Sequence, residues 1–86
     1  MSISMKPGPV ENHVRVDARG KACPLPIVLL ARALKATEAG ETVELLATDP
    51  GTLPDLRAFC DSTGNLLERT EQEGEILRAW VKKRPD

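Results

Sequence analysis

The residue in this chain best suited to covalent chemistry is Cys23, which is followed by proline at position 24 and again at position 26. Proline is tolerated in the first turn of a helix, because the N–H groups there have no partner within the helix. We therefore expect Cys23 to be the N-cap of a helix whose first residue is Pro24. The sulfur would then lie at the positive end of the helix dipole, where the thiolate is favoured and the pKa of the thiol is lowered.

Neighbouring groups are expected to add to this effect. The two prolines remove amides from the first helical turn, which leaves the N–H groups of Leu25 and Ile27 as donors near the sulfur. Arg19 and Lys21 would bring positive charge close to it. A thiol whose anion is favoured reacts as a nucleophile. The sequence therefore predicts that Cys23 is reactive and that the prolines position it.

The other cysteine, Cys60, is expected to be structural. At about 100° per residue it falls on the apolar stripe of a second helix, between Leu53 and Leu56. A free cysteine in such a place behaves as a small buried hydrophobe. The single histidine, His13, is expected to be a surface residue. Two cysteines without a CxxC pair and one histidine do not match the spacing of a zinc site, so we expect no metal and no bound cofactor.

Apolar periodicity predicts six elements in the order β-α-β-α-β-β. They are strands at residues 14–18, 42–48, 66–72 and 75–82 and helices at residues 24–38 and 52–64. This order predicts an α/β (α+β) two-layer sandwich, in which both helices cover one face of a mixed four-stranded sheet. Each crossover is expected to set neighbouring strands parallel, and the final hairpin to add an antiparallel strand. Because parallel strands end at the same edge of a sheet, Cys23 and Asp49 should lie close together.

Length and composition limit the classes of function that fit. Residues 13–83 are expected to form one small domain, between a disordered tail at residues 1–12 and a short tail at residues 84–86. A net charge of −1 and two aromatic residues offer little to a phosphate backbone or to stacked bases, so direct nucleic-acid binding is not expected. The sequence lacks the apolar run of a signal peptide or a membrane span. We expect no membrane contact and a cytoplasmic location, where thiols are reduced.

The first predicted helix has an apolar face where a solvated face would be polar. With the core positions turned to the sheet, Leu25, Leu29 and Arg32 point the opposite way. Packing of Val28 or Leu29 against the second helix would account for part of this face, but Leu25 lies in the first turn. We expect Leu25, Leu29 and Arg32, together with Asp49, to form a surface that recognises partner proteins.

Several motifs together resemble the TusA/SirA/YedF family of sulfur-carrier proteins. They are DARG at residues 17–20, CPLP at residues 23–26, GE at residues 40–41 and TDPGT at residues 48–52, within a match from about residue 14 to residue 83. The resemblance implies a two-layer α/β sandwich and a cysteine, here Cys23, that carries sulfur as a persulfide. The prolines of the family motif correspond to Pro24 and Pro26.

The resemblance also implies partner proteins. A cysteine desulfurase or a rhodanese would donate sulfur, and a DsrE-type carrier or another acceptor protein would receive it. Leu25, at the variable position of the motif, does not select among tRNA thiolation, sulfur oxidation and molybdenum-cofactor maturation. The chain would be a carrier with sulfurtransferase-type chemistry rather than a stand-alone turnover enzyme, and a monomer when free.

Two other functions remain open on the sequence. A redox or peroxide-sensing thiol would use the same cysteine, but it normally needs a resolving cysteine, and Cys60 is expected to be buried. A regulatory interaction module without covalent chemistry would keep its function in a Cys23→Ser variant.

Overall fold

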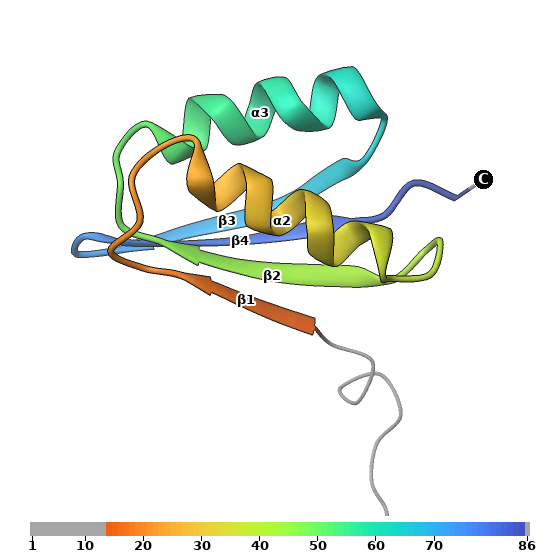
Figure 1. Cartoon of the computed structure of the whole chain (residues 1–86), viewed down its shortest axis with the longest axis horizontal. Coiled ribbons are helices and arrows are strands. Elements are labelled where there is room, and N and C mark those ends of the chain that lie inside the picture. Colours follow the sequence, from red (N-terminus) through yellow and green to blue (C-terminus); the bar gives the residue numbers. More distant parts are fainter. Residues whose placement is uncertain (1–13, 86) are drawn as a thin grey trace, which may run out of the picture.

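The structure, a computed structural model, describes residues 14–85. Six elements follow one another in the predicted order: β1 (Val14–Ala18), α2 (Leu25–Lys35), β2 (Thr42–Ala47), α3 (Thr52–Thr63), β3 (Leu66–Glu73) and β4 (Ile76–Lys82). Both helices lie on one face of a four-stranded sheet, so the chain folds into the expected two layers (Figure 1). The tail expected to be disordered, residues 1–12, and His13 lie outside the described residues.

The strand order is β1-β2-β4-β3, and it corrects one expectation. β1 and β2 are parallel neighbours as predicted, but β4 lies between β2 and β3 and is antiparallel to both. The second crossover therefore does not set two parallel strands side by side. The side chains explain this order, because β4 buries Leu77, Ala79 and Val81 whereas most of β3 is exposed. The more apolar strand takes the central position and the polar strand takes the edge.

The core lies between the helices and the inner face of the sheet. From the helices, Leu30, Leu56 and Cys60 pack against strand residues such as Val43 and Val81. Cys60 is 6% exposed, which confirms that it is a buried packing residue. Neither helix of residues 14–85 has the length and apolar character needed to cross a membrane.

Helix α2 is shorter at both ends than predicted. Its N-cap is Pro24 rather than Cys23, because the first helical hydrogen bond runs from the Val28 N–H to the Pro24 carbonyl. At the other end the N–H of Ala36 donates to the carbonyl of Ala33, three residues back, which tightens and closes the last turn. Cys23 thus lies in the loop before the helix and outside its cap.

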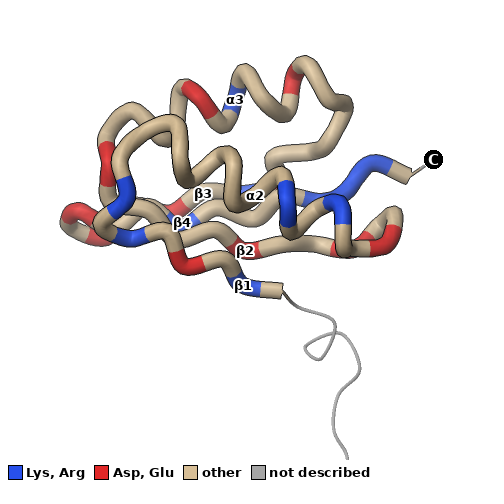
Figure 2. The backbone as a smooth tube through the Cα atoms, in the orientation of Figure 1, with Lys and Arg blue, Asp and Glu red and all other residues tan. Residues whose placement is uncertain are grey.

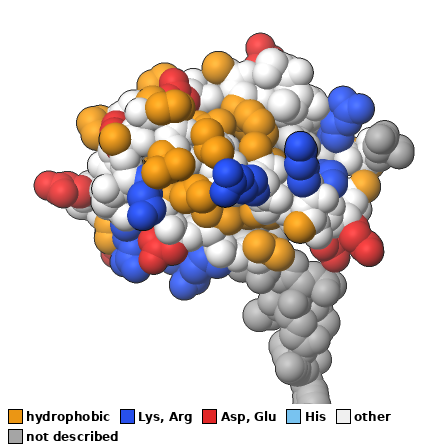
Figure 3. All heavy atoms as spheres, viewed as in Figure 1, with side chains coloured by type: hydrophobic (Ala, Val, Ile, Leu, Met, Phe, Trp, Pro, Cys, Tyr) orange, Lys and Arg blue, Asp and Glu red, His pale blue; other side chains and the backbone are white. Residues whose placement is uncertain are grey.

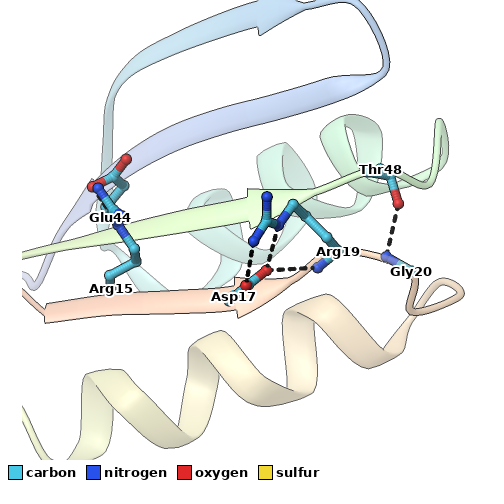
Figure 4. A network of polar contacts seen from close by, with 6 residues as sticks. All are labelled: Arg15, Asp17, Arg19, Gly20, Glu44 and Thr48. Carbon is cyan, nitrogen blue, oxygen red and sulfur yellow. Dashed lines mark hydrogen bonds and ion pairs between the residues drawn. The ribbon is translucent and has the colours of Figure 1, made fainter.

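The face of the sheet away from the helices carries ion pairs. Glu44 is 3% exposed, and its carboxylate lies 3.3 Å from Arg15 Nε (Figure 4). The same carboxylate lies 3.5 Å from Arg78 Nε. Beside it, the guanidinium of Arg69 stacks over the ring of Trp80, 4.1 Å from the centroid. The helix-covered side of the sheet therefore holds the apolar core, and the opposite side carries these charged and aromatic side chains.

Candidate functional site

Two loops meet at the edge where the parallel strands β1 and β2 end (Figure 1). The loop after β1 carries Cys23, and the loop after β2 carries Asp49. The N–H of Cys23 donates to Asp49 Oδ2 at 2.9 Å, so the two residues lie together as the sequence predicts. A second bond ties the same loops, from the N–H of Gly20 to Thr48 Oγ1 at 2.9 Å (Figure 4).

Asp49 holds the backbone on both sides of the sulfur. Besides the bond from Cys23, its Oδ1 accepts the N–H of Gly51 at 2.7 Å. These two bonds, the one from Cys23 first, lower the pKa of the Asp49 carboxyl. Gly51 lets this loop approach closely, because a Cβ there would lie 3.5 Å from Cys23 Sγ and 3.3 Å from Asp49 Oδ1.

The thiol of Cys23 is exposed and donates to a carboxylate that the sequence analysis did not include in the site. Its partner is Asp55 Oδ2, in the first turn of α3. This hydrogen bond is the largest cause that raises the pKa of the Cys23 thiol to about 11, followed by desolvation from neighbouring groups and by the negative charges of Asp55 and Asp49. The expectation of a lowered pKa is therefore wrong for the free protein.

The groups that were expected to favour the thiolate are occupied elsewhere. The N–H of Leu25 donates to the carbonyl of Ala22 at 2.9 Å, and the N–H of Ile27 donates to that of Pro24 at 3.0 Å. These amides close the turn into the helix, so they do not stabilise an anion on the sulfur.

Arg19, which was expected to help, forms an ion pair with Asp17 instead (Figure 4). Its Nη2 lies 2.8 Å from Asp17 Oδ2, and its Nε donates to Oδ1 at 2.9 Å. These side-chain hydrogen bonds are the largest cause that lowers the pKa of Asp17 to about 2. The positive charge of Arg19 is thus matched at the end of β1, before the loop reaches Cys23.

The sequence placed Asp55 in the first turn of the second predicted helix but gave no reason to bring it to the sulfur. A signal was available in the topology, since the amino end of that helix follows the same edge of the sheet as Cys23. Asp55 lies six residues after Asp49, so the loop and the first helical turn present both carboxylates to one sulfur.

The exposed face of α2 next to Cys23 is apolar. Leu25 and Val28 are each 41% exposed, whereas Leu29 is half-buried and packs against the core. The helix has no acidic residue in its first turn, and Arg32 and Lys35 lie in its last turn (Figure 2). Hydrophobic side chains gather over α2 and toward α3, with cations beside them (Figure 3).

A groove continues this apolar surface between the two helices. It has a volume of about 450 Å³ and is lined by Pro24, Ile27, Asp55, Ala58, Phe59 and Ser62. Since Asp55 is one of its walls, the groove begins at the residue that binds the Cys23 thiol. A partner that covered α2 would therefore also reach the sulfur.

Known proteins resemble this chain both in fold and in sequence. A SirA-like protein from Desulfitobacterium hafniense has a crystal structure that superposes with a TM-score of 0.72, at 24% identity, over 83% of this chain and 97% of that one. At this identity the likeness shows the fold alone. A family model described as Sulfurtransferase TusA matches residues 14–83.

Individual relatives are similar over most of this chain. YrkF of Bacillus subtilis is 48% identical over 68 residues, which are 79% of this chain and 37% of YrkF, so the chain spans little more than a third of that relative. YrkI of the same organism is 46% identical over 69 residues, 79% of this chain and 91% of YrkI. The sulfur carrier protein TusA of Allochromatium vinosum is 40% identical over 79% of this chain and 90% of its own length. This chain therefore belongs to the TusA family of sulfur-carrier proteins.

Proposed function

We propose that this chain accepts sulfane sulfur on Cys23 as a persulfide and hands it to a partner protein. The observation that carries the proposal is an exposed thiol at the sheet edge, held by two loops in a chain of the TusA family. Pro24 and Pro26 fix the turn that follows the cysteine, and Pro26 is buried against the core.

Loading is a thiol exchange that needs no external oxidant or reductant. The sulfur of Cys23 attacks the terminal sulfur of a donor persulfide, and a new S–S bond forms at Cys23. The S–S bond of the donor breaks, and its electron pair stays on the inner sulfur of the donor. That sulfur leaves as a thiolate and takes up the proton that Cys23 has lost. Unloading is the same exchange with the acceptor thiol as the attacking group.

The donor and acceptor are proteins that dock beside the sulfur. We place their contact on Leu25, Leu29 and Arg32 of α2, together with Asp49 in the neighbouring loop. An exposed leucine next to the sulfur lets a partner exclude water from it, and the arginine on the same helix gives the approach a charge to recognise.

A cysteine desulfurase or a rhodanese is the proposed donor, and a DsrE-type or other sulfur-accepting protein is the proposed acceptor. The pathway served is tRNA thiolation, sulfur oxidation or cofactor maturation. A cysteine that carries sulfur needs a compartment in which thiols are kept reduced, and we therefore propose a cytoplasmic location.

Transfer from a donor protein tests this proposal. The purified chain is mixed with a cysteine desulfurase and cysteine that is radiolabelled on its sulfur. The label on the chain is then followed on gels run without reductant. We expect label that is removed by reductant, absent from Cys23→Ser and retained by Cys60→Ser. Label that persists on Cys23→Ser would contradict the proposal.

A further inference from the structure

We propose that Asp55 makes the site sensitive to its load: it retains the sulfur of the empty carrier and expels the terminal sulfur of the loaded one. The inference rests on the proposed function, because it concerns the persulfide on Cys23. It assigns a role to Asp55, which touches the reacting sulfur.

In the empty carrier the sulfur is the donor in its contact with Asp55. Cys23 Sγ donates to Asp55 Oδ2, which requires the thiol to keep its proton. The neighbouring loop holds Cys23 through the bond from its N–H to Asp49 Oδ2 at 2.9 Å. The empty carrier thus keeps a protonated sulfur turned toward α3.

A carboxylate oxygen already lies on the α3 side of this sulfur. The Asp55 carboxylate occupies the direction in which the Cys23 thiol donates its hydrogen bond. A persulfide adds a second sulfur about 2 Å beyond the first. The added atom cannot occupy the position of the Asp55 oxygen, so the side chain of the loaded cysteine must turn away or displace that carboxylate.

Electrostatic repulsion favours the same outcome as the steric conflict with Asp55: the terminal sulfur of the persulfide turns away from α3. The terminal S–H of a persulfide is more acidic than a thiol, so the loaded form bears a negative charge where the empty form bears a proton. Asp49 and Asp55 are the carboxylates beside it, and within residues 14–85 neither forms an ion pair. Arg19 is bound to Asp17, and Lys21 is exposed in the loop before Cys23. An anion next to these carboxylates is repelled.

The two effects give the carrier different surfaces before and after loading. Without sulfur, the thiol is held by Asp55 and reacts slowly until a donor displaces the carboxylate or offers it a cation. With sulfur, the anion points away from α3, toward solvent and toward an acceptor. The same residue therefore protects the empty carrier and presents the cargo of the loaded one.

The Asp55→Asn variant tests this inference because its amide keeps the shape and removes the charge. The asparagine N–H can donate to a sulfur anion, so it should favour the thiolate in the empty form and retain the persulfide in the loaded form. The two forms should therefore change reactivity in opposite directions. The control is Asp61→Asn, which removes the same charge from an exposed position on the same helix.

Uncharged reagents measure both forms. The empty protein is alkylated with iodoacetamide at pH 8. The protein loaded with inorganic polysulfide is treated with a neutral water-soluble phosphine, which takes the terminal sulfur as a phosphine sulfide and leaves the thiol. Intact mass before treatment establishes that one sulfur atom has been added.

In Asp55→Asn we expect alkylation of the empty form to rise by up to about tenfold, as the thiol pKa falls from about 11 toward 9.0. Desulfuration of the loaded form should fall by about tenfold, the effect of one hydrogen bond to a charged group. Asp61→Asn should change neither rate.

Changes in the same direction, or no change in either rate, would overturn the inference. If the substitution merely opened the loop that carries Cys23, the rates of alkylation and of desulfuration would both rise. If that loop closed over the sulfur, both rates would fall. If the wild-type protein adds no sulfur at Cys23, the proposed function fails and this inference fails with it. Normal loading without opposite changes overturns the inference alone.

Discussion

The Cys23 thiol of the empty protein is expected to ionise near pH 11, far above an ordinary cysteine. Its hydrogen bond to Asp55 holds the proton, and desolvation from neighbouring groups and the charges of Asp55 and Asp49 add to the effect. The perturbation that tests this is pH itself, applied to the unmodified protein. The reactivity of the thiol should keep rising after that of a cysteine in a short peptide has levelled off.

The size of the effect follows from the two pKa values. At pH 8 a thiol with a pKa of about 11 is ionised in about one molecule per thousand, whereas one at 9.0 is ionised in about one molecule per eleven. The thiolate fraction is thus about ninetyfold lower in the protein. The more basic thiolate is about eightfold more nucleophilic, since reactivity rises with pKa at a slope of about 0.4–0.5. Cys23 should therefore be alkylated about tenfold more slowly than the peptide thiol at pH 8.

The assay is the rate of iodoacetamide alkylation between pH 7 and pH 11.5, read by the mass of the peptide that contains Cys23. Circular dichroism at each pH controls for unfolding, and the buried Cys60 serves as an internal marker of it. A rate that levels off at or below pH 9 would refute the reasoning, because Asp55 would then not hold the thiol proton.

Two further predictions concern docking and stability. Leu25→Glu and Arg32→Glu should each slow sulfur transfer from a cognate donor protein by about tenfold and leave loading by polysulfide unchanged, because both residues lie in the proposed contact with the donor protein. Arg57→Glu on α3 is the control. Equal slowing of polysulfide loading would place the effect in the chemistry of the site. The raised thiol pKa also predicts how the free energy of unfolding depends on pH. Between pH 9.0 and about 11 the folded chain keeps the Cys23 proton that the unfolded chain has lost, so this contribution is fully present below pH 9 and disappears as pH rises to about 11. Urea unfolding across this range should show a steeper loss of stability in the wild-type protein than in Cys23→Ala, and parallel losses would contradict the raised pKa.

Local patterns in the sequence were sufficient to predict most of the fold. The apolar spacing of each helix and strand reports which face is buried, and this property depends on neighbours along the chain. Cys60 could be assigned to the core for the same reason. The central position of β4 could not be derived from the hairpin rule, because it depends on competition between β3 and β4 for a place beside β2.

The protonation state of Cys23 could not be predicted from its neighbours along the chain. The helix dipole, the prolines and the nearby cations all favoured a thiolate, and each of them belongs to the segment of sequence around the cysteine. The partner that decides the pKa, Asp55, is 32 residues away along the chain and comes from another helix. The position of Cys23 beside Asp49 was predictable, because the order of the strands alone brings their ends together.

The central claim is that Cys23 carries sulfur, and mapping of the added atom tests it most directly. The wild-type chain, Cys23→Ser and Cys60→Ser are treated with the same sulfane-sulfur donor, freed of it, alkylated, digested and analysed by peptide mass. We predict one added sulfur on the peptide with Cys23 in the wild-type chain and in Cys60→Ser, and none in Cys23→Ser. Sulfur found mainly on Cys60, or retained after Cys23 is replaced, would contradict the claim.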